Sequence, residues 1–326
     1  MQSADEQLVT VAEIADAARR LAPVTVRTPL VPFPRITPSL LIKPESLQPT
    51  GSFKLRGAYA AITANIEVAR ERGVVAHSSG NHGHAVAYAA ALLGVRAVVV
   101  VPENAPKTKT DAITSYGAEL ITVAPTLAAR LAATEKLVAE HQYLLVPPFD
   151  DRRVIAGQGT IGLEIAADCP QADPVVVVPV SGGGLIAGIA AAIRARLPQA
   201  VIVGVEPELA ADAQESLRRG ERVAWSSAKV QRTVADALRV EQVGMLPFAH
   251  IREQVTSIIT VTEEEILTTV RRLALEARLI AEPGGAVAVA ACLFRADELP
   301  PGRTRVAVLS GGSIDPALLA TALAAH

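Results

Sequence analysis

The sequence contains little cysteine and few aromatic residues, and its charges nearly cancel. Its two cysteines, Cys169 and Cys292, lie far apart in apolar stretches. This excludes a disulfide framework and favours reduced thiols in a cytoplasmic setting. Aromatic residues make up 3% of the 326 positions, so Val, Ile, Leu and Ala must form the core. The net charge of -2 gives no excess of positive charge with which to bind nucleic acid or an anionic membrane.

One long stretch carries no charge. Residues 174–193 could span a bilayer by length alone, but Pro179 and the glycines at 182–184 interrupt them. Such a break would leave backbone groups unpaired in lipid. The N-terminus is polar and acidic and has no apolar run of the secretory type. We therefore expect a soluble protein with no membrane partner.

Apolar runs rich in Val, Ile and Leu alternate with Ala-rich helical stretches along the chain. The expected strands are 74–78, 97–101, 119–123, 175–180, 201–206 and 306–309, and the expected helices are 54–64, 83–93, 107–116, 126–140 and 185–196. Continuous apolar strands separated by helices predict parallel sheets covered on both faces. We expect an α/β protein with two open domains, a large one from residues 1–72 and 150–326 and a small one from residues 73–149.

The run 175–180 is followed by Ser181, Gly182, Gly183, Gly184 and Leu185 and then by a helix. A glycine loop at a helix start exposes backbone N–H groups to an anion, and a phosphate fits this pattern. A tight turn is the simpler alternative. A dinucleotide site is another, because Glu206 ends the next strand about 20 residues later. That alternative keeps an NAD-dependent oxidoreductase open, and a non-catalytic cofactor-binding protein is a further alternative.

Lys54 follows a Pro/Thr/Gly/Ser loop and begins a predicted helix. A helix N-terminus disfavours the charged form of an amine, which suits a nucleophilic or Schiff-base lysine. The alternative is an ordinary solvated lysine.

Residues with hydroxyl and amide side chains follow two further predicted strands. Ser78, Ser79, Asn81 and His82 follow the strand at 74–78, and Ser310 follows the strand at 306–309. The first set could bind a carboxylate or simply cap a helix. The histidines near it lack a fourth ligand at a zinc spacing.

Five segments taken together resemble one family of enzymes. They read Ser-Phe-Lys-Leu-Arg-Gly-Ala at 52–58, Ser-Ser-Gly-Asn-His-Gly at 78–83, Ala-Gly-Gln-Gly-Thr at 156–160, Ser-Gly-Gly-Gly-Leu at 181–185 and Leu-Ser-Gly-Gly at 309–312. In this order they resemble the serine racemase and threonine/serine dehydratase family of fold-type II pyridoxal-phosphate enzymes, over nearly the whole chain. The resemblance implies a tryptophan synthase β-like fold, a pyridoxal 5'-phosphate cofactor and a homodimer.

The resemblance also implies roles for single residues around the cofactor. Lys54 would hold it covalently and act as the base at the substrate α-carbon. Phe53 would pack on its ring and Asn81 would bond its phenolic oxygen. Residues 181–185 would cradle the phosphate, and Ser310 would face the ring nitrogen. A neutral hydroxyl there does not force protonation of that nitrogen, which suits β-elimination.

Substrate and metal residues follow from the same resemblance. The residues implied for the substrate are Ser78, Asn81, His82 and, with a poorer local match, Arg130. Ser79 matches the family's second base, on the opposite face of the substrate. The residues implied for a divalent cation are Glu206, the Ala210 carbonyl and Asp212, and oxygen donors of this kind suit Mg, Ca or Mn. A solvated acidic turn is the alternative.

The sequence departs from its relatives where the substrate is expected to lie. It has Ala235, Asp236 and Ala237 where relatives often have Ala-Asp-Gly, and Val240 stands where the racemase has a serine. We predict a lyase that converts L-threonine or L-serine to a 2-oxo acid and ammonia. The alternatives are an amino-acid racemase and a dehydratase of another β-hydroxy amino acid, such as 3-hydroxyaspartate or phenylserine. Because Ser310 lies near the end of the sequence, we expect no C-terminal regulatory domain.

Overall fold

The computed structural model describes residues 7–78, 80–105 and 107–324. Its strands are β1 (Val31–Pro32), β2 (Leu40–Pro44), β3 (Val74–His77), β4 (Ala97–Pro102), β5 (Glu119–Val123), β6 (Leu144–Leu145), β7 (Val175–Pro179), β8 (Val201–Pro207), β9 (Ser257–Val261) and β10 (Arg305–Leu309). Its α-helices are α1 (Val11–Leu21), α2 (Lys54–Thr63), α3 (Ile66–Arg72), α4 (Asn81–Leu93), α5 (Lys107–Thr114), α6 (Leu127–His141), α7 (Arg152–Asp168), α8 (Gly184–Arg196), α9 (Asp212–Arg219), α10 (Ser227–Val230), α11 (Met245–Gln254), α12 (Glu263–Arg272), α13 (Pro283–Phe294) and α14 (Pro316–Ala324). Shorter helical turns are η2 (Glu45–Leu47), η3 (Asp236–Leu238), η4 (Leu273–Ala277) and η5 (Ala296–Glu298).

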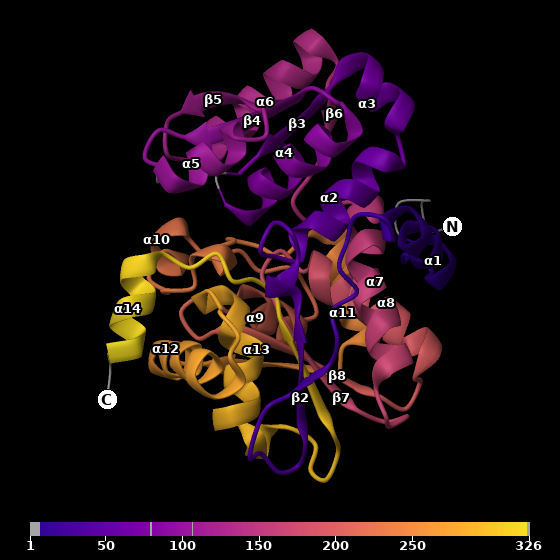
Figure 1. The fold of residues 1–326 in the computed structure, drawn as a ribbon, viewed down its shortest axis with the longest axis vertical. Helices are drawn as coiled ribbons and strands as arrows, with labels where there is room; N and C mark the ends of the chain where they lie inside the picture. The colour runs from indigo at the N-terminus through magenta and orange to yellow at the C-terminus, as the bar shows by residue number, and fades with distance from the viewer. Residues whose placement is uncertain (1–6, 79, 106, 325–326) are drawn as a thin grey trace.

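These strands form two separate sheets. The larger has the order β1-β2-β10-β7-β8-β9 and is parallel except for the β1–β2 pair, and the smaller has the order β5-β4-β3-β6 and is parallel throughout. Figure 1 shows the smaller sheet with α3 to α6 in the upper lobe and the larger sheet with α7 to α14 below it. The α/β fold with mostly parallel sheets is therefore confirmed. We propose 1–72 with 150–326, and 73–149, as the two domains, since β3 to β6 all lie in the second segment.

The central strands are buried on both faces, which explains their unbroken apolar sequences. All five residues of β7 and all five of β10 are buried. Sequence patterns did not predict β2 and β9, which lie beside β10 and β8 in the larger sheet, nor the two-residue strands β1 and β6. Among the described residues, no helix is long and apolar enough to cross a membrane.

Helices α7 and α8 approach each other unusually closely. A Cβ atom at Gly188 would lie 2.3 Å from the Ile155 carbonyl oxygen, and one at Gly159 would lie 2.9 Å from the Gly188 carbonyl oxygen. Only glycine permits this spacing, so the glycines of the segment 156–160 serve helix packing.

A buried cluster of charges joins β2, η2, α2 and α7. The Arg56 guanidinium donates to Glu45 Oε2 at 2.8 Å and to Glu164 Oε1 at 2.7 Å, and Lys43 Nζ donates to Glu164 Oε2 at 2.6 Å. Thr28 Oγ1 also donates to Glu45. Burial by itself would raise the pKa of Glu45, but the Arg56 guanidinium holds that pKa below its usual value. The two carboxylates and the two cations therefore neutralise each other inside the protein.

Removing one partner of this cluster should destabilise the fold strongly. We expect Arg56→Ala to lower the free energy of unfolding by about 3–5 kcal/mol, because it leaves the buried Glu45 carboxylate without its ion-pair partner. The matched control is Arg96→Ala, which removes an exposed pair with Glu119 and should cost less than about 1 kcal/mol. Urea unfolding monitored by circular dichroism measures both. Equal losses in the two variants would contradict the prediction.

Candidate active site

Lys54 is the first residue of α2 and its amine is enclosed by protein. Its Nζ donates to the Pro148 carbonyl oxygen at 2.6 Å and lies 5.0 Å from the centre of the Phe53 ring. Burial lowers the pKa of Lys54 to about 8. A lowered pKa is what the sequence predicted, but the cause is burial and not the helix terminus. At neutral pH roughly a tenth of the amine is uncharged and nucleophilic.

The glycine loop lies between β7 and α8. Gly183 has a φ of +87°, which a side chain would strain, and a Cβ at Gly182 would lie 2.2 Å from the Phe149 ring. The Oγ of Ser181 is buried and has no hydrogen-bond partner in the described part of the chain. The first turn of α8 also has no side-chain cap. An unpartnered hydroxyl beside free helix N–H groups suits a bound anion.

Backbone contacts bring Ser310 next to Lys54. Ser310 follows β10 and is buried, and its carbonyl oxygen accepts a hydrogen bond from the Phe53 N–H at 3.0 Å. Ser52 and Gly311 form an isolated antiparallel bridge at the same place. Two motifs from opposite ends of the sequence therefore meet at the carboxyl edge of the larger sheet.

The loop after β3 contributes Ser78 and Asn81, while Ser79 lies outside the described residues. Ser78 Oγ accepts from the Gly80 N–H at 3.1 Å, and a Cβ at Gly83 would lie 2.0 Å from the Ser78 carbonyl oxygen. Asn81 begins α4 and donates from Nδ2 to Glu282 Oε1 at 2.7 Å. Asn81 thus faces the larger sheet across the space between the lobes.

His82 is buried, and its ring bonds to the protein. Its Nε2 lies 2.8 Å from the Val146 carbonyl oxygen, so this nitrogen must carry the proton. Nδ1 is then an acceptor, and it has no partner in the described part of the chain. Burial, with the Lys54 charge, lowers the pKa of His82 to about 3 and keeps the ring neutral. An acceptor nitrogen cannot bind a carboxylate, so only the main-chain N–H of His82 suits that predicted role.

Glu282 is a site residue that the sequence assignment omitted. It precedes α13, and its N–H donates to the Gly311 carbonyl oxygen at 3.0 Å. Burial, with the nearby Asp236, raises the pKa of Glu282 to about 7. The segment Glu-Pro-Gly-Gly-Ala was the available signal, because Pro at a helix start places the preceding residue at its N-cap. Glu282 can therefore hold a proton near neutral pH beside Asn81.

Arg130 forms no hydrogen bond or ion pair with these groups in the described residues. It lies on α6, and its charge adds to burial in lowering the pKa of His77. Its Nε donates to the Thr126 carbonyl oxygen at 3.5 Å. Burial lowers the pKa of Arg130, and Glu241 of the larger lobe opposes that effect. Across the described ranges no carboxylate lies within 4.0 Å of it. Arg130 is thus an uncompensated cation near the carboxyl end of β3.

The acidic segment after β8 holds two buried carboxylates. Glu206 accepts from the N–H groups of Ala213 and Gln214 at 3.1 and 2.7 Å, and Asp212 Oδ2 accepts from the Val243 N–H at 2.8 Å. Burial and the charge of Asp212 raise the pKa of Glu206 well above its usual value, and burial raises the pKa of Asp212 to about 7. Ala210 is buried in the turn between them. No cluster of three or more His, Cys, Asp or Glu side chains suited to a metal occurs in the residues described.

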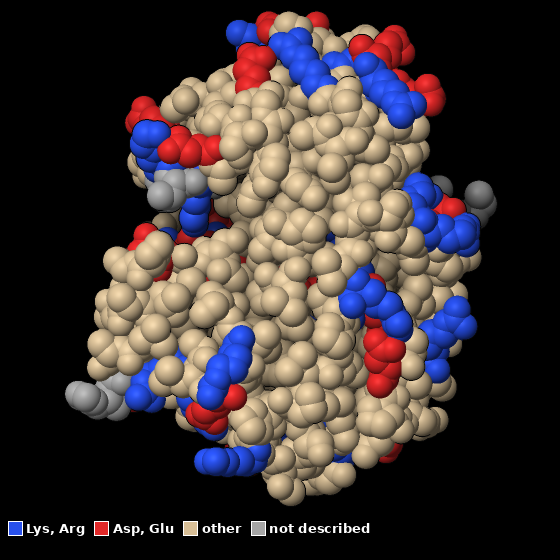
Figure 2. Space-filling model, in the orientation of Figure 1, with Lys and Arg blue, Asp and Glu red and all other residues tan. Residues whose placement is uncertain are grey.

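Two side-chain contacts link the upper and lower lobes beside the candidate site. Lys109 of α5 forms an ion pair with Asp236 of η3 at 2.7 Å, in addition to the Asn81–Glu282 bond. Figure 2 shows the surface hollowed between the two lobes at the left.

Comparisons with known proteins identify the class to which this site belongs. The family model described as "Pyridoxal-phosphate dependent enzyme" matches residues 21–311. The chain is a member of this pyridoxal-phosphate dependent enzyme family, which confirms the predicted family, its cofactor and the predicted enzyme class. The NAD-dependent alternative is accordingly set aside.

Individual relatives show which enzymes of this family the chain is similar to. The chain is 37% identical to L-threo-3-hydroxyaspartate ammonia-lyase of Saccharomyces cerevisiae, covering 96% of this chain and 95% of that one. It is 40% identical to L-threonine ammonia-lyase of Thermotoga maritima, covering 94% and 76%. The crystal structure of serine racemase from Dictyostelium discoideum superposes with a TM-score of 0.88 at 36% identity, covering 94% and 99%. The ammonia-lyase relatives support an enzyme of the lyase type.

The lowered pKa of Lys54 predicts the pH at which the apoprotein reacts with pyridoxal phosphate. We expect the rate of covalent attachment to rise with pH around a midpoint near 8, because only the neutral amine attacks the aldehyde. Borohydride trapping at a series of pH values, followed by peptide mass spectrometry, measures this rate at Lys54. Modification of the exposed Lys136 in the same samples is the internal control. A Lys54 midpoint near 10.5, the ordinary lysine value, would contradict the assignment.

Proposed function

We propose that the protein is an ammonia-lyase that converts L-threonine or L-serine to a 2-oxo acid and ammonia. The observation that carries the proposal is the enclosed Lys54 amine, which donates to the Pro148 carbonyl oxygen while Phe149 packs at Gly182 and the Phe53 N–H donates to Ser310. Pyridoxal phosphate, when bound, withdraws electrons from the substrate α-carbon. Members of this family with ammonia-lyase names support the reaction type.

The chain's own groups fit this cofactor. The buried, unpartnered Ser181 Oγ and the uncapped start of α8 would hold its phosphate together with Gly182, Gly183, Gly184 and Leu185. Phe53 would pack against its ring. The neutral Ser310 would face its nitrogen. Asn81, held by Glu282, would meet its phenolic oxygen.

Lys54 would then move the proton on which the reaction depends. Its neutral amine takes the α-proton of the substrate, and the β-hydroxyl leaves as water. Water later adds and ammonia departs, which gives the 2-oxo acid. The N–H groups at the start of α4, with Ser78 and Asn81, would bind the substrate carboxylate. Racemisation with Ser79 as the second base remains the alternative for this site.

Loss of Lys54 tests this function directly. We expect Lys54→Ala to lower the rate of 2-oxo acid formation from L-threonine and L-serine by at least about 10⁴-fold, because the α-proton then has no base. A coupled lactate dehydrogenase assay follows the product, and chiral chromatography follows the D-isomer. Lys109→Ala, on the rim, should retain most of the activity. Accumulation of mainly D-serine in the wild type would favour the racemase.

A second candidate substrate is 3-hydroxyaspartate. The half-buried Arg130 lacks a carboxylate partner in the described structure, and a side-chain carboxylate of the substrate could supply one. The likeness to the yeast L-threo-3-hydroxyaspartate ammonia-lyase agrees with this candidate.

Substitution of Arg130 separates the two candidates. If hydroxyaspartate is the substrate, Arg130→Gln should lower kcat/KM for L-threo-3-hydroxyaspartate by roughly 10-fold or more and change that for L-threonine little, because a charged hydrogen bond is lost. Steady-state kinetics with both amino acids measures the ratio. An equal fall in kcat/KM for both substrates would rule out a role of Arg130 in recognising the side chain of the substrate.

We also propose that Glu206, Asp212 and the Ala210 carbonyl hold a divalent cation of the Mg, Ca or Mn kind. Two buried carboxylates with raised pKa values support this, because a cation would offset their mutual repulsion. Mg²⁺ should then raise the melting temperature of the wild type and not that of Asp212→Asn. No difference between the two would refute the site.

A homodimer is the expected assembly. Leu47 and Ile280 are half-exposed, and they lie on neighbouring segments, since a Cβ at Gly312 would be 3.0 Å from Ser46 Cβ and 2.8 Å from the Ile280 carbonyl oxygen. Figure 2 shows a broad face with few charges across the middle of the molecule. Light scattering should give twice 34.0 kDa, and a monomer would refute the dimer. A cytoplasmic location stays a prediction, in keeping with the two free cysteines.

A further inference from the structure

The glycine loop is in contact with the short segment of chain that leads into α11. This segment comprises residues 243–246, and its Gly244 N–H donates to the Gly182 carbonyl oxygen at 3.1 Å. The next glycine of the loop packs on the same segment, since a Cβ at Gly183 would lie 2.9 Å from Val243 Cγ2. The shape of the glycine loop therefore depends on the position of residues 243–246.

Asp150 fixes the start of α11. Its Oδ2 accepts a hydrogen bond from the Met245 N–H at 2.8 Å, and its Oδ1 accepts one from the Leu246 N–H at 3.0 Å. These N–H groups belong to the first turn of the helix and have no partner within it. The N-cap position is occupied by Gly244, which has no side chain to accept them. Asp150, 95 residues before Met245, therefore does the work of an N-cap side chain.

The residue before Asp150 touches the glycine loop itself. A Cβ at Gly182 would lie 2.2 Å from the Phe149 ring, and one at Gly184 would lie 2.8 Å from the Phe149 carbonyl oxygen. A Cβ at Gly244 would lie 2.9 Å from Asp150 Cγ. Phe149 and Asp150 thus pack against both the glycine loop and the segment that supports it.

Other side chains hold the beginning of the same segment. Asp212 Oδ2 accepts from the Val243 N–H at 2.8 Å, and Arg222 Nε donates to the Val243 carbonyl oxygen at 2.8 Å. Asp150 differs from these anchors because it binds the two residues that follow Gly244. The segment is therefore fixed on both sides of the glycine that bonds to the loop.

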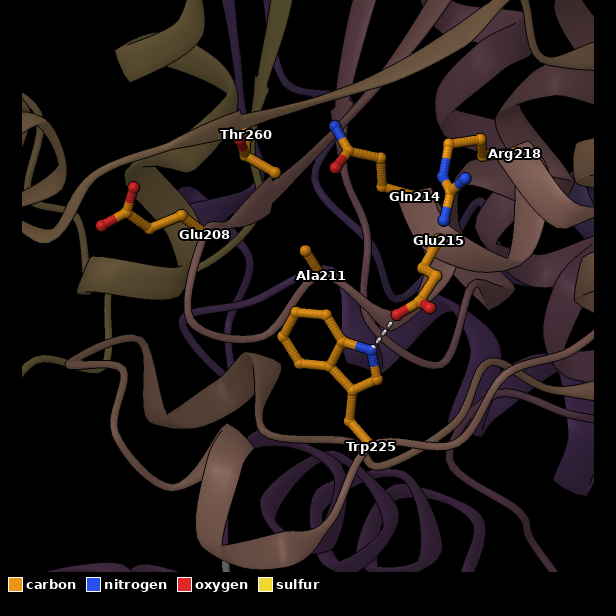
Figure 3. Close-up of a pocket in the computed structure, with 7 residues that line it drawn as sticks. All are labelled: Glu208, Ala211, Gln214, Glu215, Arg218, Trp225 and Thr260. Atoms are coloured by element: carbon orange, nitrogen blue, oxygen red, sulfur yellow. Dashed lines mark hydrogen bonds between the residues drawn. The ribbon is translucent and has the colours of Figure 1, made fainter.

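Trp225 fixes the chain just before this segment. Its main-chain N–H donates to the Glu241 carbonyl oxygen at 2.8 Å, and its indole N–H donates to Glu215 Oε2 at 2.6 Å. Figure 3 shows the second bond, at the wall of a surface hollow that Glu208 and Arg218 also line. Trp225 thus belongs to the support of residues 243–246.

We propose that Asp150 is a positioning residue that holds the glycine loop in the shape that binds the phosphate of the cofactor. This inference rests on the proposed placement of that phosphate at residues 181–185. Without the Asp150 carboxylate, the first two N–H groups of α11 lose their acceptor. Gly244 then loses its fixed neighbours, and with them the constraint on its bond to Gly182.

Two forms of the cofactor separate binding of the phosphate from reaction of the aldehyde. Pyridoxal 5'-phosphate and pyridoxal carry the same aldehyde, and only the first carries a phosphate. Equilibrium dialysis of the full-length apoprotein gives a dissociation constant for each. We expect Asp150→Ala to raise that of pyridoxal 5'-phosphate about 5-fold or more, which corresponds to the loss of a helix cap. That of pyridoxal should change little, because the ion pairs of Arg56 hold the backbone of Lys54.

Two further variants serve as controls. Asp150→Asn keeps one acceptor oxygen, so its ratio of the two dissociation constants should lie between those of the wild type and Asp150→Ala. Thr262→Ala removes an N-cap of the same kind from α12. It should lower the melting temperature and leave the ratio unchanged. Circular dichroism establishes that each variant is folded.

An unchanged ratio in folded Asp150→Ala would overturn the proposal, whether both affinities fall or neither does. If that variant does not fold, an unchanged ratio in Asp150→Asn has the same meaning. Equal binding of the two cofactor forms by the wild type would refute the phosphate placement and this inference with it. The lyase function is tested separately by Lys54→Ala, so its failure is distinguishable from failure of this inference.

Discussion

The burial of Arg56 between Glu45 and Glu164 is the constraint on which the site depends. Arg56 is the third residue of α2. The ion pairs that join it to η2 and α7 therefore also hold the start of that helix, where Lys54 lies. A buried guanidinium tolerates little movement, because any loss of its partners leaves charge in a medium of low dielectric. We infer that these buried charges fix the position of the Lys54 amine.

Burial also shifts the pKa values of side chains in the candidate site. It lowers the pKa of Lys54 to about 8, keeps His82 neutral and raises the pKa of Glu282 to about 7. Burial thus shifts basic and acidic groups in opposite directions, each toward its uncharged form. Lys54 and Glu282 can therefore exchange protons near neutral pH, which the proposed elimination would require.

Much of the fold could be predicted because the strands that form the centre of each sheet have unmistakable apolar runs. β7 and β10 were found in this way, whereas β2 and β9 were missed. β2 ends in Lys43 and Pro44, and the charge of Lys43 is buried only because Glu164 of α7 meets it. Similarly, Ser310 and Lys54 were assigned roles from motifs, but Glu282 was assigned none, since its importance arises from its contact with Asn81.

The sequence by itself determined the alternation of strands and helices, the glycine loop at residues 181–185 and the family of the chain. These are local patterns, and they need only neighbouring residues to be recognised. The tertiary structure alone decided that burial lowers the pKa of Lys54, that the His82 ring faces Val146 and that Trp225 shares a hollow with Glu208 and Arg218. Desolvation and hydrogen bonding depend on which distant segments meet, and no local pattern contains that information.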